Sequence, residues 1–232
     1  RINARRISIA KGGEAYEFLG RTSWESTRAR QLLTKEPDLI DWIDHVVSPK
    51  DVFLDVGANA GTVTVYASRK AASVISVECN YHNLAALSCN VQLNNCANVK
   101  IFSVALGENN ELQRLGGGIA SSVSGGSLSV SSQEDSSGQP VMTFALDHLL
   151  EQFKGCFPSV MKIDVDGTEV SVLRGARKTL ESGQLRHLMV EVMNETENVE
   201  AVFSILEAAS YCLVKTVSVE SGQYLNTYWV RT

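Results

Sequence analysis

The sequence of 232 residues is poor in the residues that build metal sites, disulfide frameworks and membrane spans. It has five cysteines, an odd number without a C-x-x-C pair, and four scattered histidines, no two of which are four residues apart. Disulfide frameworks and zinc sites need such pairs, so we expect reduced thiols, a cytoplasmic location and no metal. The longest apolar runs are about five residues, far short of the ~20 that cross a bilayer, which predicts no membrane span.

Length and composition are those of a globular protein. The chain is 44% hydrophobic and 20% charged, which suits one large domain or at most two small ones. It begins at Arg1 rather than Met, which favours a piece of a longer protein. The net charge of −5 is uneven, because residues 1–35 carry eight Lys or Arg against three Glu. This basic segment either steers an anionic ligand or is an ordinary solvated surface.

Short apolar runs alternate with helical spacing from residue 52 onward. Unbroken runs are typical of strands buried on both faces, and the alternation predicts a parallel sheet with helices on both sides. The last two runs are separated by too few residues for a crossover helix and should form an antiparallel hairpin at the sheet edge. The predicted strands are residues 52–56, 74–78, 99–106, 160–165 and 188–192, followed by 212–217 and 224–231 in the hairpin.

Two regions depart from this alternation. Residues 1–50 contain helical patterns at 22–33 and 37–47, and we predict an N-terminal helical extension packed on a core domain of residues 51–232. Residues 116–138 contain nine Ser and six Gly, a composition typical of a flexible loop. This insertion is either a lid over a site or a plain disordered loop.

The most informative segment is V-F-L-D-V-G-A-N-A-G at residues 52–61, a buried strand that leads into a glycine turn. Glycines at a strand-to-helix turn let a ligand approach the backbone, and the helix that follows offers unpaired N–H groups. We therefore predict a ligand site at this turn.

Acidic residues at strand ends indicate which ligand binds. Glu78 ends the next predicted strand, where its carboxylate is placed to accept the hydroxyls of a ribose. A dinucleotide site uses G-x-G-x-x-G, whereas here Asn59 takes the middle position and Asp55 precedes the turn. An acid there repels a pyrophosphate and attracts the sulfonium or ammonium of S-adenosylmethionine. Charge therefore favours this methyl donor over NAD.

Several motifs resemble the FkbM family of S-adenosylmethionine-dependent methyltransferases, and the resemblance extends over about residues 37–195. It implies a Rossmann-like class I methyltransferase fold: an α/β structure with a seven-stranded mostly parallel sheet, an antiparallel C-terminal hairpin and helices on both faces. It also implies that residues 62–66 form a helix, although their β-branched side chains favour a strand, because parallel neighbours need a crossover. The motifs are residues 52–61, V-E-C-N at 77–80, S-V-A-L-G at 103–107, T-F-A-L-D at 143–147, K-I-D-V-D-G-T-E at 162–169 and V-L-R-G-A at 172–176.

By this resemblance, the site residues lie at the strand ends. Those expected to bind the donor are Asp55, Gly57, Ala58, Asn59 and Gly61 at its methionine end, Glu78 at the ribose, Cys79, Asn80 and Ala105 around the adenine, and Asp164 where methyl group and acceptor meet. The candidates for a base or for positioning the acceptor are Asp164, Lys162, Asp166 and Glu191. Two further interpretations stay open: Lys162 only pairs with Asp164, or Asp164, Asp166 and Glu191 hold Mg²⁺.

The predicted function is transfer of a methyl group to a hydroxyl of a small molecule or glycan, where the hydroxyl is implied by the resemblance alone. Alignment of the reactants supplies about 7–11 kcal/mol in well-oriented systems and a general base only about 3–5, so the lack of a Ser-His-Asp set does not argue against it. The alternatives are an NAD-binding oxidoreductase and a module that binds the donor without turnover. The acidic body disfavours nucleic acid as acceptor.

Overall fold

The structure is a computed structural model that describes residues 4–116, 130–131, 138–153 and 157–232. Its centre is a seven-stranded sheet with the order β12-β13-β11-β10-β3-β4-β5. All neighbours from β11 to β5 are parallel, and β13 runs antiparallel to both β11 and β12. The strands are β3 (Val52–Val56), β4 (Ser73–Val77), β5 (Val99–Phe102), β10 (Val160–Ile163), β11 (His187–Met193), β12 (Tyr211–Val219) and β13 (Tyr224–Arg231). The predicted fold class is confirmed.

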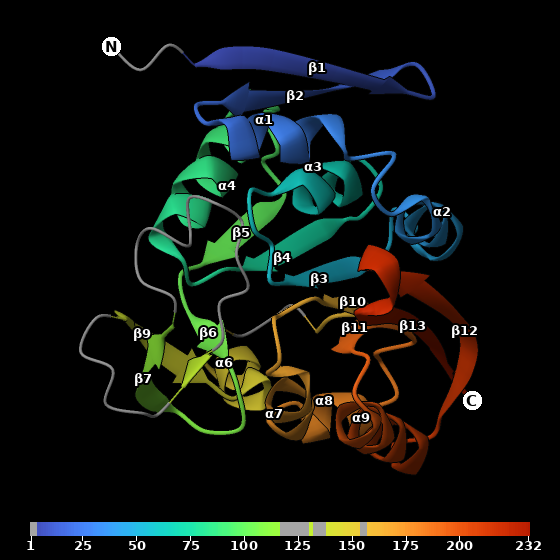
Figure 1. Ribbon diagram of the computed structural model, residues 1–232. Helices are drawn as coiled ribbons and strands as arrows, with labels where there is room; N and C mark the ends of the chain where they lie inside the picture. Colours follow the sequence, from blue (N-terminus) through green and yellow to red (C-terminus); the bar gives the residue numbers. More distant parts are fainter. Residues whose placement is uncertain (1–3, 117–129, 132–137, 154–156) are drawn as a thin grey trace.

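Helices cover both faces of this sheet (Figure 1). One face carries α2 (Pro37–Val46), α3 (Thr62–Ser68) and α4 (Tyr81–Leu93), and the other carries α6 (Leu146–Gln152), α7 (Glu169–Arg174), α8 (Arg177–Glu181) and α9 (Thr196–Ala208). The predicted helix at 62–66 is confirmed within α3. The side chains of consecutive β3 residues lie on opposite faces of the sheet, since Phe53 packs in one buried cluster and Leu54 in the other. Among the described residues, no helix is long and apolar enough to cross a membrane.

A second, smaller sheet follows β5 and has the order β6-β9-β7-β8. Its strands are β6 (Ala105–Leu106), β7 (Glu111–Leu115), β8 (Val130–Ser131) and β9 (Gln139–Phe144). The prediction of one strand over residues 99–106 was wrong, because the chain leaves the main sheet after Phe102 and Ala105 pairs with Thr143 of β9. Most of the Ser/Gly insertion, residues 117–129 and 132–137, lies outside the described residues.

The sequence analysis predicted an N-terminal helical extension, but the first part of this segment forms strands. A hairpin of β1 (Arg5–Lys11) and β2 (Glu14–Gly20) precedes α1 (Ser23–Arg30) and α2. Its two-residue turn is Gly12-Gly13, with positive φ at both positions. Two adjacent glycines between alternating apolar residues are a hairpin signal that the sequence analysis missed. The two predicted helices are present.

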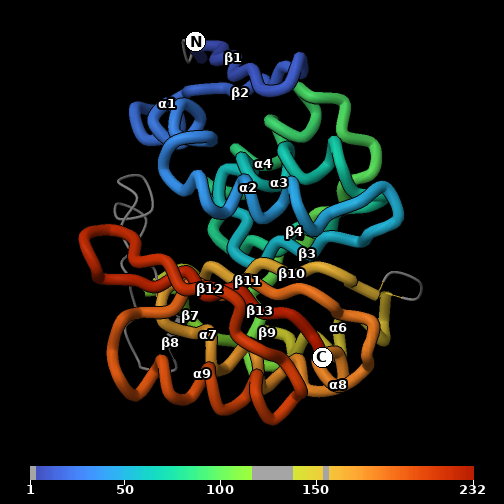
Figure 2. Tube along the Cα trace, turned by 90° about the vertical axis from the view of Figure 1, so that its right-hand side faces the viewer, coloured from blue at the N-terminus to red at the C-terminus, as the bar shows by residue number. Residues whose placement is uncertain are grey.

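The side-chain amides of Asn90 in α4 and of Asn94, directly after α4, attach this hairpin to the rest of the protein. The Asn94 amide accepts the Glu17 N–H at 2.9 Å and donates to the Glu17 carbonyl at 2.6 Å, and Asn90 accepts the Leu19 N–H at 2.9 Å. The amides thus pair with the free edge of β2 as a further strand would. Figures 1 and 2 show the hairpin outside α3 and α4, so that the layers follow in the order hairpin, helices, sheet, helices.

Candidate active site

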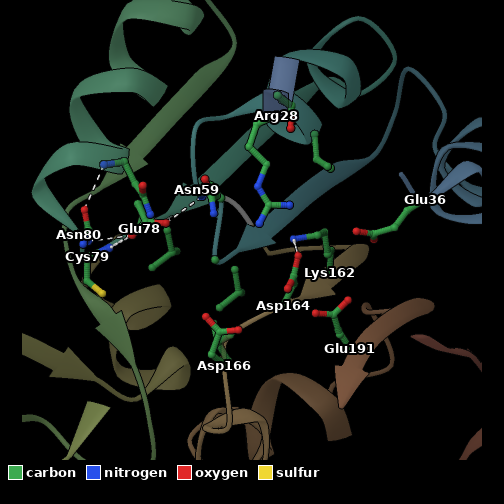
Figure 3. A pocket seen from close by; sticks show the side chains of 18 of the residues that line it. Arg28, Glu36, Asn59, Glu78, Cys79, Asn80, Lys162, Asp164, Asp166 and Glu191 are labelled. Carbon is green, nitrogen blue, oxygen red and sulfur yellow. Dashed lines mark hydrogen bonds and ion pairs between the residues drawn. The ribbon is translucent and has the colours of Figure 1, made fainter. Parts of the chain in front are cut away.

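A cavity of about 230 Å³ opens at the carboxyl ends of β3, β4, β10 and β11 (Figure 3). In an open parallel sheet, ligands bind at this edge, where the helices change from one face to the other. The cavity brings together ten of the residues that the sequence analysis selected: Gly57, Ala58, Asn59, Glu78, Cys79, Asn80, Ala105, Lys162, Asp164 and Glu191. Asp55 and Gly61 are not among its lining residues.

The backbone amides of the glycine turn are all hydrogen-bonded. All five N–H groups of residues 57–61 donate to acceptors within the protein. The first two donate to the Val77 carbonyl, each at 3.0 Å, and the Asn59 N–H donates to Glu78 Oε2 at 2.8 Å. The amides of the turn are therefore used within the protein, and the unpaired N–H groups that the sequence analysis assigned to the following helix stay a prediction.

Glu78 is fixed at the cavity wall by three amide N–H groups. Its Oε2 accepts from Asn59, and its Oε1 accepts from Cys79 at 2.9 Å and from Asn80 at 2.7 Å. The residue is only 8% exposed. Burial raises the pKa of Glu78 above its ordinary value, even though the amide donors favour the charged form. The bonds hold the carboxylate in a single orientation beside the glycine turn.

Asp55 lies beneath the site rather than in it. Its side chain is fully buried, Oδ2 accepts the Thr64 hydroxyl at 2.7 Å, and Oδ1 lies 3.3 Å from Lys162 Nζ. The strand register explains this placement, because Asp55 and Lys162 are direct partners on the neighbouring strands β3 and β10. The predicted contact between Asp55 and the methionine end of a donor is not supported, since the protein's own side chains surround this carboxylate.

Gly61 has a packing role. It precedes α3 with φ at +81°, and a Cβ at this position would lie 2.5 Å from Leu87 Cδ1 of α4. A side chain here would push the two helices apart, which explains the glycine without a ligand. The predicted donor contact of Gly61 is therefore not supported either.

The buried Lys162 forms an ion pair with the partly exposed Asp164 at the floor of the cavity. Lys162 Nζ lies 2.9 Å from Asp164 Oδ2, and Lys162 is 2% exposed. Burial opposes the charge on Lys162, but the carboxylates of Asp164 and Asp55 together raise its pKa above the usual range. Burial alone would likewise raise the pKa of Asp164, yet the Lys162 ammonium holds it below the ordinary value. Lys162 is thus a cation and Asp164 an anion at neutral pH.

Glu191, at the end of β11, is in the opposite protonation state. Burial, followed by the charges of Asp164 and Glu36, raises the pKa of Glu191 to about 9. Its Oε2 is buried and has no hydrogen-bond partner among the described residues. At pH 7 the group is a neutral acid, so it can donate a proton to a hydrogen bond but does not serve as a base.

The proton on Glu191 makes stability depend on pH. Between about pH 4.5 and 9 the folded chain keeps a proton that the unfolded chain releases, so the unfolding free energy falls as pH rises. Glu191→Gln cannot lose this proton, so its unfolding free energy lacks this pH dependence. From pH 6 to pH 8, the difference in unfolding free energy between the variant and wild type should shift by about 2 kcal/mol in favour of the variant. Urea denaturation at both pH values measures it, with Glu181→Gln on α8 as the surface control. Parallel profiles of Glu191→Gln and wild type would contradict a neutral Glu191.

The N-terminal segment contributes a wall of the cavity that the sequence analysis missed. Trp24 and Arg28 come from α1, while Lys35 and Glu36 precede α2. Lys35 Nζ lies 3.0 Å from Glu36 Oε1 and 3.0 Å from Glu220 Oε1. The only signal in the sequence was the positive charge of residues 1–35, which does not distinguish one basic residue from another.

A metal site receives no support from the side chains. Across the part of the chain that the structure describes, no three His, Cys, Asp or Glu side chains are grouped so that they could hold a metal ion. Lys162 already neutralises Asp164, which the Mg²⁺ interpretation would need as a ligand. The absence of a bound metal stays a prediction.

Comparisons with known proteins agree with this geometry. A family model described as "Methyltransferase FkbM domain" matches residues 55–213. The search of curated proteins finds no match. Among solved structures, the FkbM methyltransferase of Methylobacillus flagellatus is similar at 14% identity with a TM-score of 0.60, over 79% of this chain and 44% of that protein. This chain therefore spans less than half the length of that relative.

Two further structures cover most of both chains. Fibrillarin of Aeropyrum pernix, solved with bound S-adenosylmethionine, has 12% identity and a TM-score of 0.57 over 99% of this chain and 84% of its own. Precorrin-6y C5,15-methyltransferase of Geobacter metallireducens has 13% identity and a TM-score of 0.54 over 88% and 92%. At such low identity these neighbours establish the fold alone.

Proposed function

The chain belongs to the FkbM family of methyltransferases, and from this premise we propose that it transfers a methyl group from S-adenosylmethionine to a hydroxyl of a small molecule or glycan. One observation carries the proposal: the Glu78 carboxylate, held by three amides, lies beside a glycine turn at the carboxyl edge of the sheet. A neighbour of the same fold binds this donor. The negative charge of residues 36–232 favours such an acceptor over nucleic acid.

The cavity residues divide between the parts of the donor. Glu78 accepts hydrogen bonds from the ribose hydroxyls, and Cys79, Asn80 and Ala105 border the adenine. Gly57, Ala58 and Asn59 lie at the methionine end, and Asp164 lies where the methyl group meets the acceptor. Asp55 acts indirectly, because it fixes Lys162.

When bound, the donor supplies a methyl group activated by positive sulfur. The acceptor oxygen would take the methyl group as the carbon–sulfur bond breaks, the sulfur would leave as a neutral thioether, and the hydroxyl proton would pass to water. Asp164, kept ionised by Lys162, accepts a hydrogen bond from that hydroxyl and orients its oxygen. Its lowered pKa makes it a weak base, so its main contribution is alignment, which is worth about 7–11 kcal/mol in well-oriented systems. Glu191, which lines the same cavity and is protonated at neutral pH, offers a hydrogen-bond donor beside Asp164.

Calorimetric titration and a screen with labelled donor test this function. S-adenosylmethionine is expected to bind and NAD is not, and label should move to a hydroxylated metabolite or sugar. Tight NAD binding without donor binding would establish the oxidoreductase alternative instead. Donor binding without turnover on any acceptor would leave the non-catalytic module.

Glu78→Gln should weaken binding of S-adenosylmethionine about 10- to 100-fold. The amide replaces one charged acceptor by a donor that faces the Asn59 N–H, and hydrogen bonds to a charged group are worth about 1.5–3 kcal/mol. Calorimetry measures the affinity, and Glu111→Gln on the exposed side of β7 is the control. Equal affinity in Glu78→Gln and wild type would remove Glu78 from the donor site.

A further inference from the structure

Three cationic side chains border the cavity, and two of them are already neutralised. Lys162 Nζ lies 3.3 and 2.9 Å from two carboxylates, and Lys35 Nζ lies 3.0 Å from two others. Each of these lysines therefore carries one positive charge that two neighbouring carboxylates more than balance. The third cation is Arg28, and its surroundings are different.

Arg28 has no carboxylate partner in the described part of the chain, where no ion pair or hydrogen bond joins its guanidinium to another residue. Its one contact of note is with Trp24, whose ring centroid lies 5.8 Å from Arg28 Cζ. The side chain is partly buried, and Figure 3 shows it extending from α1 into the cavity, toward the side where Lys162 and Asp164 lie. A half-buried guanidinium without a counter-charge is suited to an anionic ligand group.

The backbone offers little competition for such an anion. The five amides of the glycine turn, residues 57–61, are used within the protein. The helix that follows, α3, begins at Thr62 on the cavity wall, but its first-turn amides carry only partial positive charge, whereas Arg28 carries a full one. A negatively charged group in this cavity thus has Arg28 as its best-placed partner.

We propose that Arg28 binds the carboxylate at the methionine end of S-adenosylmethionine. The inference rests on the proposed function and deepens it. The donor carries a sulfonium, an ammonium and a carboxylate close together. The acids of the cavity suit the two cationic groups, and the planar guanidinium suits the carboxylate through a two-point hydrogen bond.

This assignment gives the N-terminal segment a function. Helix α1 lies outside residues 55–213, which match the family model, yet it supplies the group that the rest of the cavity lacks. The hairpin and the asparagines of α4 then matter for donor binding, because they hold the segment that carries α1 against the core.

The test compares S-adenosylmethionine with its decarboxylated form, which keeps the sulfonium and ammonium and lacks only the carboxylate. The 232-residue chain should bind the intact donor about 10- to 100-fold more tightly by calorimetry. Arg28→Gln should lose this preference by weakening the intact donor alone, and Arg28→Lys should keep part of it. Arg30→Gln, exposed on the same helix, is the matched control and should keep all of it.

Each other outcome has a distinct meaning. If Arg28→Gln keeps the preference, other groups such as the first amides of α3 hold the carboxylate, and the inference is overturned. If the variant weakens both ligands equally, Arg28 acts only through packing, which also overturns it. If the wild-type protein binds neither ligand, the proposed function itself fails. Thermal unfolding of each variant checks that the comparison is made between folded proteins.

Discussion

Lys162→Met is expected to lower the free energy of unfolding by about 3–5 kcal/mol, because it leaves the buried carboxylate of Asp55 without its cation. Asp55 is fully buried, and its Oδ1 lies 3.3 Å from Lys162 Nζ. Asp164 loses its 2.9 Å ion pair at the same time. Methionine has a similar length but no charge, so the packing changes little while the electrostatic balance is lost. Denaturant unfolding at pH 7 measures the difference.

Two further variants separate charge from packing. Lys178→Met removes an ion pair with Glu151 that is exposed to solvent, and it should change stability little, because such pairs are screened by water. Combining Lys162→Met with Asp55→Asn should recover part of the loss, since one unpaired charge is then gone. A loss for Lys162→Met no larger than that for Lys178→Met would contradict the buried ion pair.

The same lysine links the stability of the core to the chemistry of the cavity. Lys162 holds the pKa of Asp164 below its ordinary value, and Asp164 in turn contributes to keeping Glu191 protonated. One anion and one neutral acid thus stand side by side at neutral pH. An acceptor hydroxyl between them would find one group that accepts a hydrogen bond and one that donates.

Most of the main sheet could be predicted from the sequence, because unbroken apolar runs separated by helical spacing have few topological solutions. Residues 62–66 show how topology can outweigh propensity. Their β-branched side chains favour a strand, but a crossover was needed between β3 and β4, and the chain forms α3 there. Two strands of the small sheet, β6 and β8, were missed because they have only two residues each, too few for a periodic pattern.

The site was harder to predict, because a sequence shows which strand end carries an acid but not what neutralises it. Asp55 was expected at the donor, yet the register of β3 and β10 places Lys162 beside it. Arg28 was missed for a related reason. Helix α1 is polar on nearly all sides, so nothing in its sequence distinguishes an arginine that enters a cavity from Arg30, which is exposed.

Gly57→Ala is expected to lower the free energy of unfolding by about 2–5 kcal/mol and to abolish donor binding. Gly57 has φ at +77°, a conformation that costs an L-residue about 1–2 kcal/mol. A Cβ there would also lie 1.9 Å from the Asp164 carbonyl oxygen, and overpacking of this kind costs about 1–3 kcal/mol more. The strand ends must therefore separate, which displaces Asp164 from the cavity.

A second glycine in the same conformation isolates the steric contribution. Gly183 has φ at +76°, and a Cβ there would meet no atom within 4 Å. Gly183→Ala should therefore lose only the backbone contribution of about 1–2 kcal/mol and should bind the donor normally. Equal losses for the two variants in denaturant unfolding would mean that β3 and β10 can separate at Gly57 without cost. The cavity would then not depend on the close approach of the turn to Asp164. The position of Asp164, on which the alignment of the acceptor depends, would not be fixed by this contact.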